Sequence, residues 1–291
     1  MSELRPDSPL RRPDSARPRE EASPQVEPPT RAELEAIHRQ LVTLPAQEGA
    51  SVVDDEDLGV TFVRGPGSGP DLTYAARPRW DDRRWPEALA AVRRRMLDEN
   101  RWPSLMLTDR LDQPPELSEA LRQQGWMPAM SEVVLWVAHA SVVPHLDPAI
   151  RIEAVQSSSL QTHEQVERVI FGLGAAQVEQ RREALRSALT AGRLRAWVVW
   201  LEDEPVAVAR LSQGDGVAGL QGIGVVEARR GQGYGTLITT IATRAGMATG
   251  NRVVWLSVRE DNDVAIGVYA KLGFGRAFTW TRWLATEHPG R

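Results

Sequence analysis

The sequence predicts an α/β protein with a mostly antiparallel, mixed sheet, an arrangement also classed as α+β, and three observations support this class. Segments with helical spacing of apolar residues follow segments in which apolar and polar residues alternate, from residue 31 to residue 284. The chain has 291 residues, about twice the roughly 150 typical of one domain, so two compact units are expected. A weak internal repeat also relates the two halves of the chain.

The predicted elements follow from these two spacings. Thr30 is suited to cap the first helix because it precedes the apolar stripe and Glu33 follows three residues later. Helices are predicted over residues 31–44, 86–100, 115–124, 160–171, 177–189, 234–248 and 263–272. Strands are predicted over residues 60–64, 104–108, 130–138, 150–154, 194–201, 205–211, 217–226, 252–258 and 274–284.

Composition and charge exclude several classes of protein. The 35 basic and 39 acidic side chains give a net charge of −4, so no overall basic field attracts nucleic acid or an anionic membrane. The lack of cysteine excludes a disulfide framework, a zinc-thiolate site and a thiol nucleophile, and it suits a cytoplasmic protein. No run approaches the roughly 18 apolar residues of a membrane-spanning helix. A small or cationic partner is expected, with the oligomeric state left open.

Proline-rich stretches divide the chain. Residues 1–30 combine seven prolines with alternating charges and lack an apolar segment, which predicts a disordered leader and not a secretory signal. Pro144 and Pro148 mark a linker. The expected units are the leader 1–30, a first domain over 31–140, the linker over 141–149 and a second domain over 150–291.

The internal repeat is most informative where its copies differ. A shift of 148 residues (273 − 125) aligns Gly125-Trp126 with Gly273-Phe274 and aligns helix 86–100 with helix 234–248 without a gap. The first copy has Arg83, Trp85 and Glu87 where the second has Gly231, Gly233 and Gly235, and it has Pro114 and Leu121 where the second has Asn262 and Tyr269. The first copy therefore lacks the function that these residues serve in the second copy.

A glycine-rich turn leaves a strand and opens a helix over residues 225–236. Its three alternating glycines allow a tight bend and a close approach of the backbone to a ligand. The following helix adds unpaired N–H donors and a partial positive charge, so the turn suits an anion such as pyrophosphate. Arg229 and Arg230 are candidates for charged contacts. The alternative is a flexible connection, which needs only one glycine.

Two other phosphate-binding motifs do not fit this turn. A Walker loop needs Gly-Lys-Ser/Thr, whereas the single lysine, Lys271, lies elsewhere. A dinucleotide fingerprint needs glycine where Thr236 stands, and the preceding strand ends a meander instead of starting a βαβ unit.

The turn instead resembles the signature of the GNAT superfamily of acyl-CoA N-acyltransferases, Arg/Gln-x-x-Gly-x-Gly/Ala, over residues 230–235. A second family element is similar to the valine-ending strand, Asn262, Ala265, Tyr269 and Gly273-Phe274 of this chain. The resemblance covers about residues 148–284. It implies two GNAT-like domains, each a mixed, mostly antiparallel twisted sheet flanked by helices, of which the N-terminal copy is degenerate.

The resemblance also implies roles for individual residues. The strand before the turn would pair with the pantetheine arm through Ile223, Gly224 and Val225. The turn would hold the coenzyme A pyrophosphate through Arg230, Gly231, Gln232, Gly233, Tyr234, Gly235 and Thr236. Asn262 would contact pantetheine, and Tyr269 would donate a proton or hydrogen bond to the departing thiolate. The alternatives are that Asn262 only caps the next helix and that Tyr269, which shares an apolar stripe, is only a core residue.

One departure from the family concerns the base. Ser257 stands where related enzymes that acetylate protein N-termini carry a glutamate base, and serine cannot take a proton unaided. Deprotonating a lysine-like amine at pH 7 costs about 4.6 kcal/mol, against about 1 kcal/mol for an α-amine. Either another group acts as base or the acceptor has a low pKa.

The predicted function is transfer of an acetyl or other acyl group from acetyl-CoA to a primary amine by direct attack, without a metal. The acceptor is a small molecule or a peptide. The alternative is a catalytically silent protein that binds acyl-CoA or serves in an interaction. His163 and Glu164 superficially suggest a metal-binding helix, but the second histidine of such helices is absent, so a surface helix is expected there.

Overall fold

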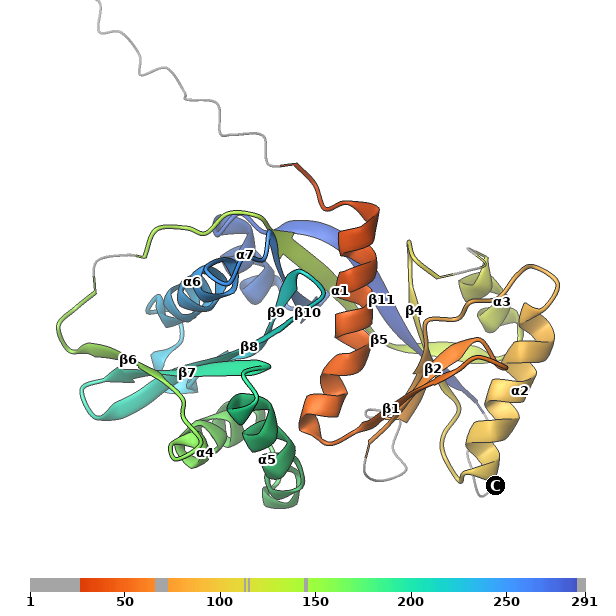
Figure 1. Ribbon diagram of the computed structural model, residues 1–291, viewed down its shortest axis with the longest axis horizontal. Helices are drawn as coiled ribbons and strands as arrows, with labels where there is room; N and C mark the ends of the chain where they lie inside the picture. The colour runs from red at the N-terminus through yellow and green to blue at the C-terminus, as the bar shows by residue number, and fades with distance from the viewer. Residues whose placement is uncertain (1–26, 66–72, 113, 115, 144–145, 287–291) are drawn as a thin grey trace, which may run out of the picture.

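The computed structural model describes residues 27–65, 73–112, 114, 116–143 and 146–286. Within them, eleven strands form one mixed sheet in the order β1-β2-β3-β4-β11-β5-β10-β9-β8-β7-β6 (Figure 1). The strands are β1 (Ser51–Asp55), β2 (Val60–Arg64), β3 (Thr73–Ala76), β4 (Ser104–Thr108), β5 (Trp126–Val137), β6 (Ile150–Ala154), β7 (Leu194–Leu201), β8 (Glu204–Gly214), β9 (Val217–Val225), β10 (Val253–Arg259) and β11 (Gly275–Ala285). The sheet is continuous across both halves of the chain.

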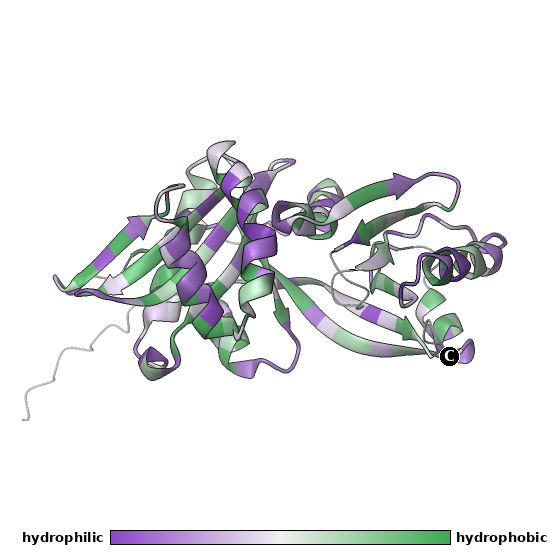
Figure 2. Ribbon diagram, turned by 90° about the horizontal axis from the view of Figure 1, so that it is seen from below, coloured by the Kyte–Doolittle hydropathy of each residue, from purple (hydrophilic) through white to green (hydrophobic). Residues whose placement is uncertain are grey.

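Helices cover both faces of this sheet. The α-helices are α1 (Arg31–Thr43), α2 (Trp85–Asp98), α3 (Leu117–Gln123), α4 (Leu160–Phe171), α5 (Ala175–Thr190), α6 (Tyr234–Met247) and α7 (Asp263–Lys271), and short 3-10 helices are η1 (Leu44–Glu48) and η2 (Glu227–Arg229). Helices α6 and α7 pack on one face of the C-terminal half, and α4 and α5 pack on the other. Figure 2 shows hydrophobic residues concentrated on the strands between these layers.

The last strand of each half pairs with a strand of the other half. Strand β11 pairs antiparallel with β4, whereas β5 pairs antiparallel with β10. The two strands also pair with each other along most of their length. Figure 1 shows them running through the centre of the molecule. Side chains of the N-terminal half therefore lie beside β10 of the C-terminal half.

Helix α1 lies across the middle of the sheet (Figure 1). Its N-terminus has the predicted capping box, in which Thr30 accepts from the Glu33 N–H and Glu33 accepts from the Thr30 N–H. The buried Trp255 indole of β10 donates to Gln40 Oε1 at 2.6 Å. The helix thus joins the N-terminal segment to a strand more than 200 residues later.

Most predicted elements form within a few residues of their expected ends, but β1 and β3 were missed. Strand β1 is an exposed edge strand that ends in two aspartates, a composition typical of a loop. Strand β3 has only four residues, all buried, and so shows no alternation. Strand β5 begins at Trp126, earlier than expected, because Pro128 falls at a register shift against β11 where its missing N–H is tolerated.

The predicted domain limits, 31–140 and 150–291, remain predictions. Of the leader 1–30, residues 1–26 lie outside the described residues. The carbonyls of Glu27 and Pro28 accept from the Arg252 guanidinium at 3.3 and 3.4 Å. Of the linker 141–149, residues 144–145 lie outside the described part as well.

Candidate active site

Strands β9 and β10 separate at one end, and this separation defines the candidate site. They pair in parallel from Val217/Val253 to Leu220/Leu256 and no further within the described chain. A register shift against β8 accompanies the separation, and Gly222 there has a φ of +55°, a conformation that favours glycine. The β10-facing backbone edge of Ile223–Val225 is therefore unpaired and available to an extended ligand.

A cavity of about 490 Å³ lies at this separation. Its walls come from α4, β9, the glycine-rich turn, α6 and the α7 region. The lining residues are Ile170, Phe171, Ile223, Gly224, Val225, Arg230, Gly235, Thr239, Asn262, Val264, Ala265, Val268 and Tyr269. The structure thus brings seven predicted site residues to one cavity, namely Ile223, Gly224, Val225, Arg230, Gly235, Asn262 and Tyr269.

The remaining predicted residues belong to the turn but do not line this cavity. They are Gly231, Gln232, Gly233, Tyr234 and Thr236. Tyr234 is buried in the core cluster beneath α6, and the Gln232 amide donates to the Ala228 carbonyl at 3.3 Å. The two glycines among them offer a ligand only their backbone.

The turn exposes the N-terminus of α6. Gly231 and Gly233 have φ values of +75° and +90°, and a Cβ added at either meets nothing within 4 Å. Gly233 is the N-cap of α6 and supplies no side-chain acceptor, so the first N–H groups of the helix lack a side-chain cap. Such a terminus favours a bound anion.

The two arginines of the turn differ. Arg229 forms an ion pair with Glu204 at 2.5 Å, so its charge is already matched. Arg230 lines the cavity, and its Nε donates to the Val225 carbonyl at 3.4 Å. Of the two predicted cations, Arg230 is the one placed at the site.

The wall opposite the turn is packed closely. A Cβ at Gly224 would lie 2.5 Å from Ile170 Cγ2 and 2.9 Å from Phe171 Cζ. The Phe171 and Val264 side chains nevertheless remain 44% and 83% exposed. The cavity mouth therefore has an apolar rim between α4 and α7.

Asn262 has the predicted capping role and keeps a free donor. Its Oδ1 accepts from the Ala265 N–H at 3.1 Å and caps α7. Within the described chain, its Nδ2 has no hydrogen-bond partner and lies on a residue that lines the cavity. The two functions expected of this residue are therefore compatible.

Tyr269 is largely buried beside the cavity and packs on Phe274, with ring centroids 5.8 Å apart. Burial raises the pKa of its phenol to about 12. No group in the described residues hydrogen-bonds its hydroxyl. Tyr269 thus presents a protonated donor without a structural partner.

A carboxylate that the sequence did not indicate lies next to Ser257. The Ser257 Oγ donates to Glu132 Oε2 at 2.6 Å, and the Trp280 Nε1–H donates to the same Oγ at 2.9 Å. Burial raises the pKa of Glu132. Glu132 was missed because it belongs to β5 of the other half, and only the exchanged strands bring it to β10.

A buried charge cluster lies behind the register shift of β9 and involves α4. Arg210 of β8 contacts Glu167 at 3.1 Å and Glu48 at 2.7 Å, and Glu167 also pairs with Arg181 of α5. A Cβ at Gly222 would lie 2.8 Å from Glu167 Oε1. The cluster therefore supports the β9 backbone at the point where the strands separate.

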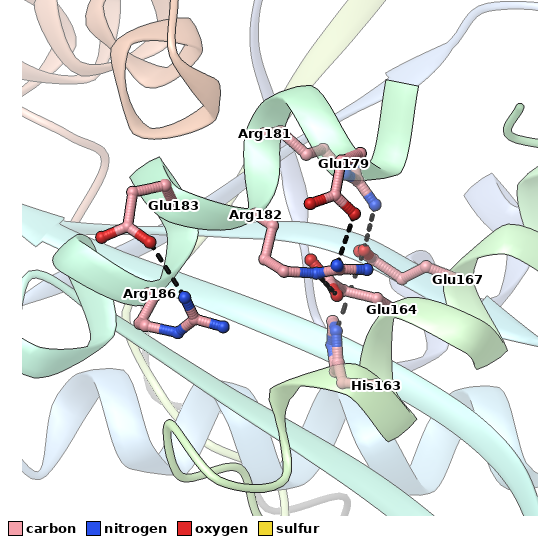
Figure 3. A network of polar contacts seen from close by, with 8 residues as sticks. All are labelled: His163, Glu164, Glu167, Glu179, Arg181, Arg182, Glu183 and Arg186. Atoms are coloured by element: carbon pink, nitrogen blue, oxygen red, sulfur yellow. Dashed lines mark hydrogen bonds and ion pairs between the residues drawn. The ribbon is translucent and has the colours of Figure 1, made fainter. Parts of the chain in front are cut away.

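The expectation of a surface helix around His163 was wrong. His163, Glu164 and Glu167 are 0%, 1% and 0% exposed. Figure 3 shows them facing the arginines of α5, with Arg182 donating to Glu164 at 2.8 Å. The arginines of α5 and β8 neutralise the carboxylates, which makes burial of this polar helix face possible.

Two absences hold for the part of the chain that the structure describes. In that part, no three His, Asp or Glu side chains are grouped as ligands for a metal ion. No described helix combines the length and the apolar character needed to cross a bilayer.

Comparison with known proteins agrees with this geometry. Residues 163–274 match the model of the acetyltransferase (GNAT) family. No curated protein matches the chain. The fold is similar to a GCN5-related N-acetyltransferase from Kribbella flavida, with TM-score 0.66, 20% identity and coverage of 86% of this chain and 96% of that one. A GCN5-related N-acetyltransferase from Sphaerobacter thermophilus gives TM-score 0.60, 15% identity and coverage of 88% and 93%.

A tandem GNAT protein from the clavulanic acid biosynthesis pathway is also similar, with TM-score 0.58, 20% identity and coverage of 78% of each chain. At these identities the solved structures establish the fold alone. With the family match, they confirm the resemblance inferred from the motifs. The similarity to the acetyltransferase (GNAT) family is thus carried by the C-terminal half of the chain.

Proposed function

We propose that this chain transfers an acetyl group from acetyl-CoA to a primary amine of a small molecule or peptide. The observation that carries the proposal is the cavity at the β9–β10 separation, where the glycine-rich turn, Asn262 and Tyr269 meet. Each supplies a different requirement of acyl transfer from a thioester. The turn offers an anion site, Asn262 a free amide donor and Tyr269 a proton donor.

In this proposal the ligand follows the unpaired edge of β9. Ile223–Val225 pair with the pantetheine arm, as an added strand would. The backbone of residues 231–236 and the Arg230 guanidinium hold the pyrophosphate at the start of α6. The exposed Phe171 and Val264 cover the apolar parts of the arm at the rim.

The chemistry follows from positioning and from Tyr269. The neutral amine attacks the thioester carbonyl directly, so the protein contributes mainly orientation. As the C–S bond breaks, the Tyr269 phenol donates its proton to the sulfur. Because its pKa is about 12, the phenol remains protonated at neutral pH.

We also propose that the N-terminal half is a degenerate copy of the same domain. The repeat offset carries the observed start of β5, Trp126, onto Phe274, one residue before β11 begins, and it carries α3 onto α7. In the N-terminal copy, the helix corresponding to α6 begins at Trp85 and has no glycine-rich turn before it. Only the C-terminal copy is then able to hold acetyl-CoA.

The test is an acceptor screen with the full chain, acetyl-CoA and a thiol reagent that reports free coenzyme A. Glycinamide, Nα-acetyl-lysine amide and glucosamine represent α-amines, lysine-like amines and aminosugars. Acceptor-dependent thiol release, together with acetylated acceptor by mass spectrometry, supports the proposal. Acetyl-CoA binding without turnover on any acceptor supports the silent binder instead.

A further inference from the structure

Glu132 of the N-terminal half contacts Ser257 where β9 and β10 begin to separate, although neither residue lines the cavity. It lies on β5 opposite Arg259 of β10 and opposite Trp280 of β11. Its carboxylate is the acceptor for the Ser257 hydroxyl at 2.6 Å. No other carboxylate in the described residues hydrogen-bonds Ser257.

Ser257 of β10 lies at the end of the pairing with β9. It is the first residue after Leu256, the last that pairs with β9, so it lies where the two strands begin to separate. Leu256 and Val258 pack in the core cluster that contains Tyr269. Because side chains alternate along a strand, Ser257 lies on the opposite face of the sheet from Tyr269.

The hydrogen bonds of Ser257 leave room for one ligand. Its hydroxyl has one proton, which is donated to Glu132, and two lone pairs. One lone pair accepts from the Trp280 N–H at 2.9 Å. The second is free to accept from the N–H of an amine.

We propose that Ser257 receives the proton of the attacking amine and that Glu132 is the terminal acceptor of that proton. This inference rests on the proposed acetyl transfer. Ser257 contacts the amine, whereas Glu132 acts through Ser257. The active site is consequently completed by a side chain of the degenerate half.

The proton transfers balance. The amine nitrogen forms a bond to the carbonyl carbon and the C–S bond breaks. The nitrogen's proton passes to Ser257 Oγ while the Ser257 proton passes to Glu132 Oε2. Tyr269 protonates the departing sulfur from the other face of the sheet. Exchange with water then returns Glu132 to the carboxylate and Tyr269 to the phenol.

The surroundings of Glu132 favour its action as a base. Burial raises its pKa, while the Ser257 hydrogen bond and the nearby Arg259 and Arg282 guanidinium groups oppose that rise. The Tyr74 hydroxyl also lies within its electrostatic reach. A carboxylate with a raised pKa accepts a proton more readily than one on the surface. The rate should therefore fall as pH decreases through the raised pKa of Glu132.

The primary variant is Glu132→Gln, tested in the full chain with acetyl-CoA and whichever of the three screened amines the wild type acetylates. The amide oxygen still accepts from Ser257, so packing is kept and only the basic group is lost. We expect kcat/KM to fall by about 10²-fold or more. The part of its decrease at low pH that exceeds the effect of protonating the amine itself should disappear. The acetyl-CoA Kd and the melting temperature should remain unchanged.

Ser257→Ala should produce a similar loss, because it interrupts the same transfer. The matched control is Asp112→Asn, another buried carboxyl with a raised pKa, about 7, whose partner is Thr108. The control should keep both the rate and the pH profile of the wild type.

Three outcomes overturn the inference. The first is a Glu132→Gln variant with the wild-type kcat/KM. The second is a Glu132→Gln variant that is slow but keeps the wild-type pH profile, since that result indicates a structural role. A wild type that acetylates none of the three amines overturns the proposed function itself. This third outcome is distinguished from failure of the Glu132 inference alone, because it is observed with the wild type before any substitution is made.

Discussion

Glu132 and Trp280 face each other across β5 and β11, and they are 148 residues apart, which is the offset of the internal repeat. In the proposed duplication these are equivalent positions of the two copies, and they are direct neighbours, as expected beside a local two-fold axis. Both side chains contact Ser257 of one copy. A carboxylate and an indole thus surround a single serine.

The first prediction concerns the glycine-rich turn. Gly233→Asp places a carboxylate at the start of α6 and forces a side chain onto a residue with a φ of +90°. We expect the acetyl-CoA Kd to rise at least about tenfold, measured by calorimetric titration. Gly250→Asp is the control, because Gly250 has a φ of +87° and equally open surroundings at the other end of α6. Equal Kd values for the two variants would mean that the turn is only a connection.

The second prediction concerns Tyr269. Tyr269→Phe removes a hydroxyl without a hydrogen-bond partner in the described chain and keeps the ring contact with Phe274. Turnover should drop by about 10²-fold or more, while the acetyl-CoA Kd and melting temperature change little. Steady-state kinetics with the best amine of the screen measure this effect. Unchanged turnover would leave Tyr269 as a core residue.

The third prediction concerns the buried charge cluster. Arg210→Met leaves Glu48 and Glu167 without this partner, so the free energy of unfolding should fall by about 3–5 kcal/mol. Arg186→Met removes the partner of Glu183 on the exposed face of α5 and should cost less than about 1 kcal/mol (Figure 3). Urea denaturation followed by circular dichroism compares the two. Similar losses would show that the buried cluster contributes no more than a surface ion pair.

The fourth prediction concerns pH. Burial, with the Arg210 and Arg181 charges, lowers the pKa of His163 to about 4. The unfolded chain therefore binds a proton on His163 that the folded chain does not, and stability falls as pH decreases from about 6.5 to about 4. His163→Gln should remove up to about 3 kcal/mol of this decrease.

Urea denaturation at several pH values checks this prediction. His139→Gln, at an exposed histidine, serves as the control for the substitution itself. Burial and two arginines lower the pKa of His38 to about 3. In every variant His38 therefore keeps its own contribution to the fall in stability at low pH. A His163→Gln chain with an unchanged pH dependence would contradict the assignment.

Local patterns predicted most of the secondary structure, since helical stripes and strand alternation depend on neighbouring residues. They predicted the α1 capping box and the strand limits of β2, β4 and β7. They did not predict that β5 pairs with β10 and β11 with β4, because the alternation of apolar and polar residues is the same whichever strand is the neighbour. The repeat indicated that the two strands are equivalent, but not which neighbour each pairs with.

The same distinction applies to the candidate site. The glycines, Asn262 and Tyr269 lie close together in the chain, and their spacing was sufficient to group them. Glu132 is 125 residues from Ser257, and nothing near it in the sequence marks it as functional. The burial of Glu167 in α4 was not predicted, because its neutralising partners, Arg181 and Arg210, come from other elements.

The central claim is that one acetyl-CoA site forms at the β9–β10 separation of the C-terminal half. The most direct measurement is a calorimetric titration of the full chain with acetyl-CoA, fitted for stoichiometry. We expect one acetyl-CoA per chain, because only the C-terminal copy has the glycine-rich turn before its helix. Two equivalent sites per chain, or no binding at all, would contradict the account.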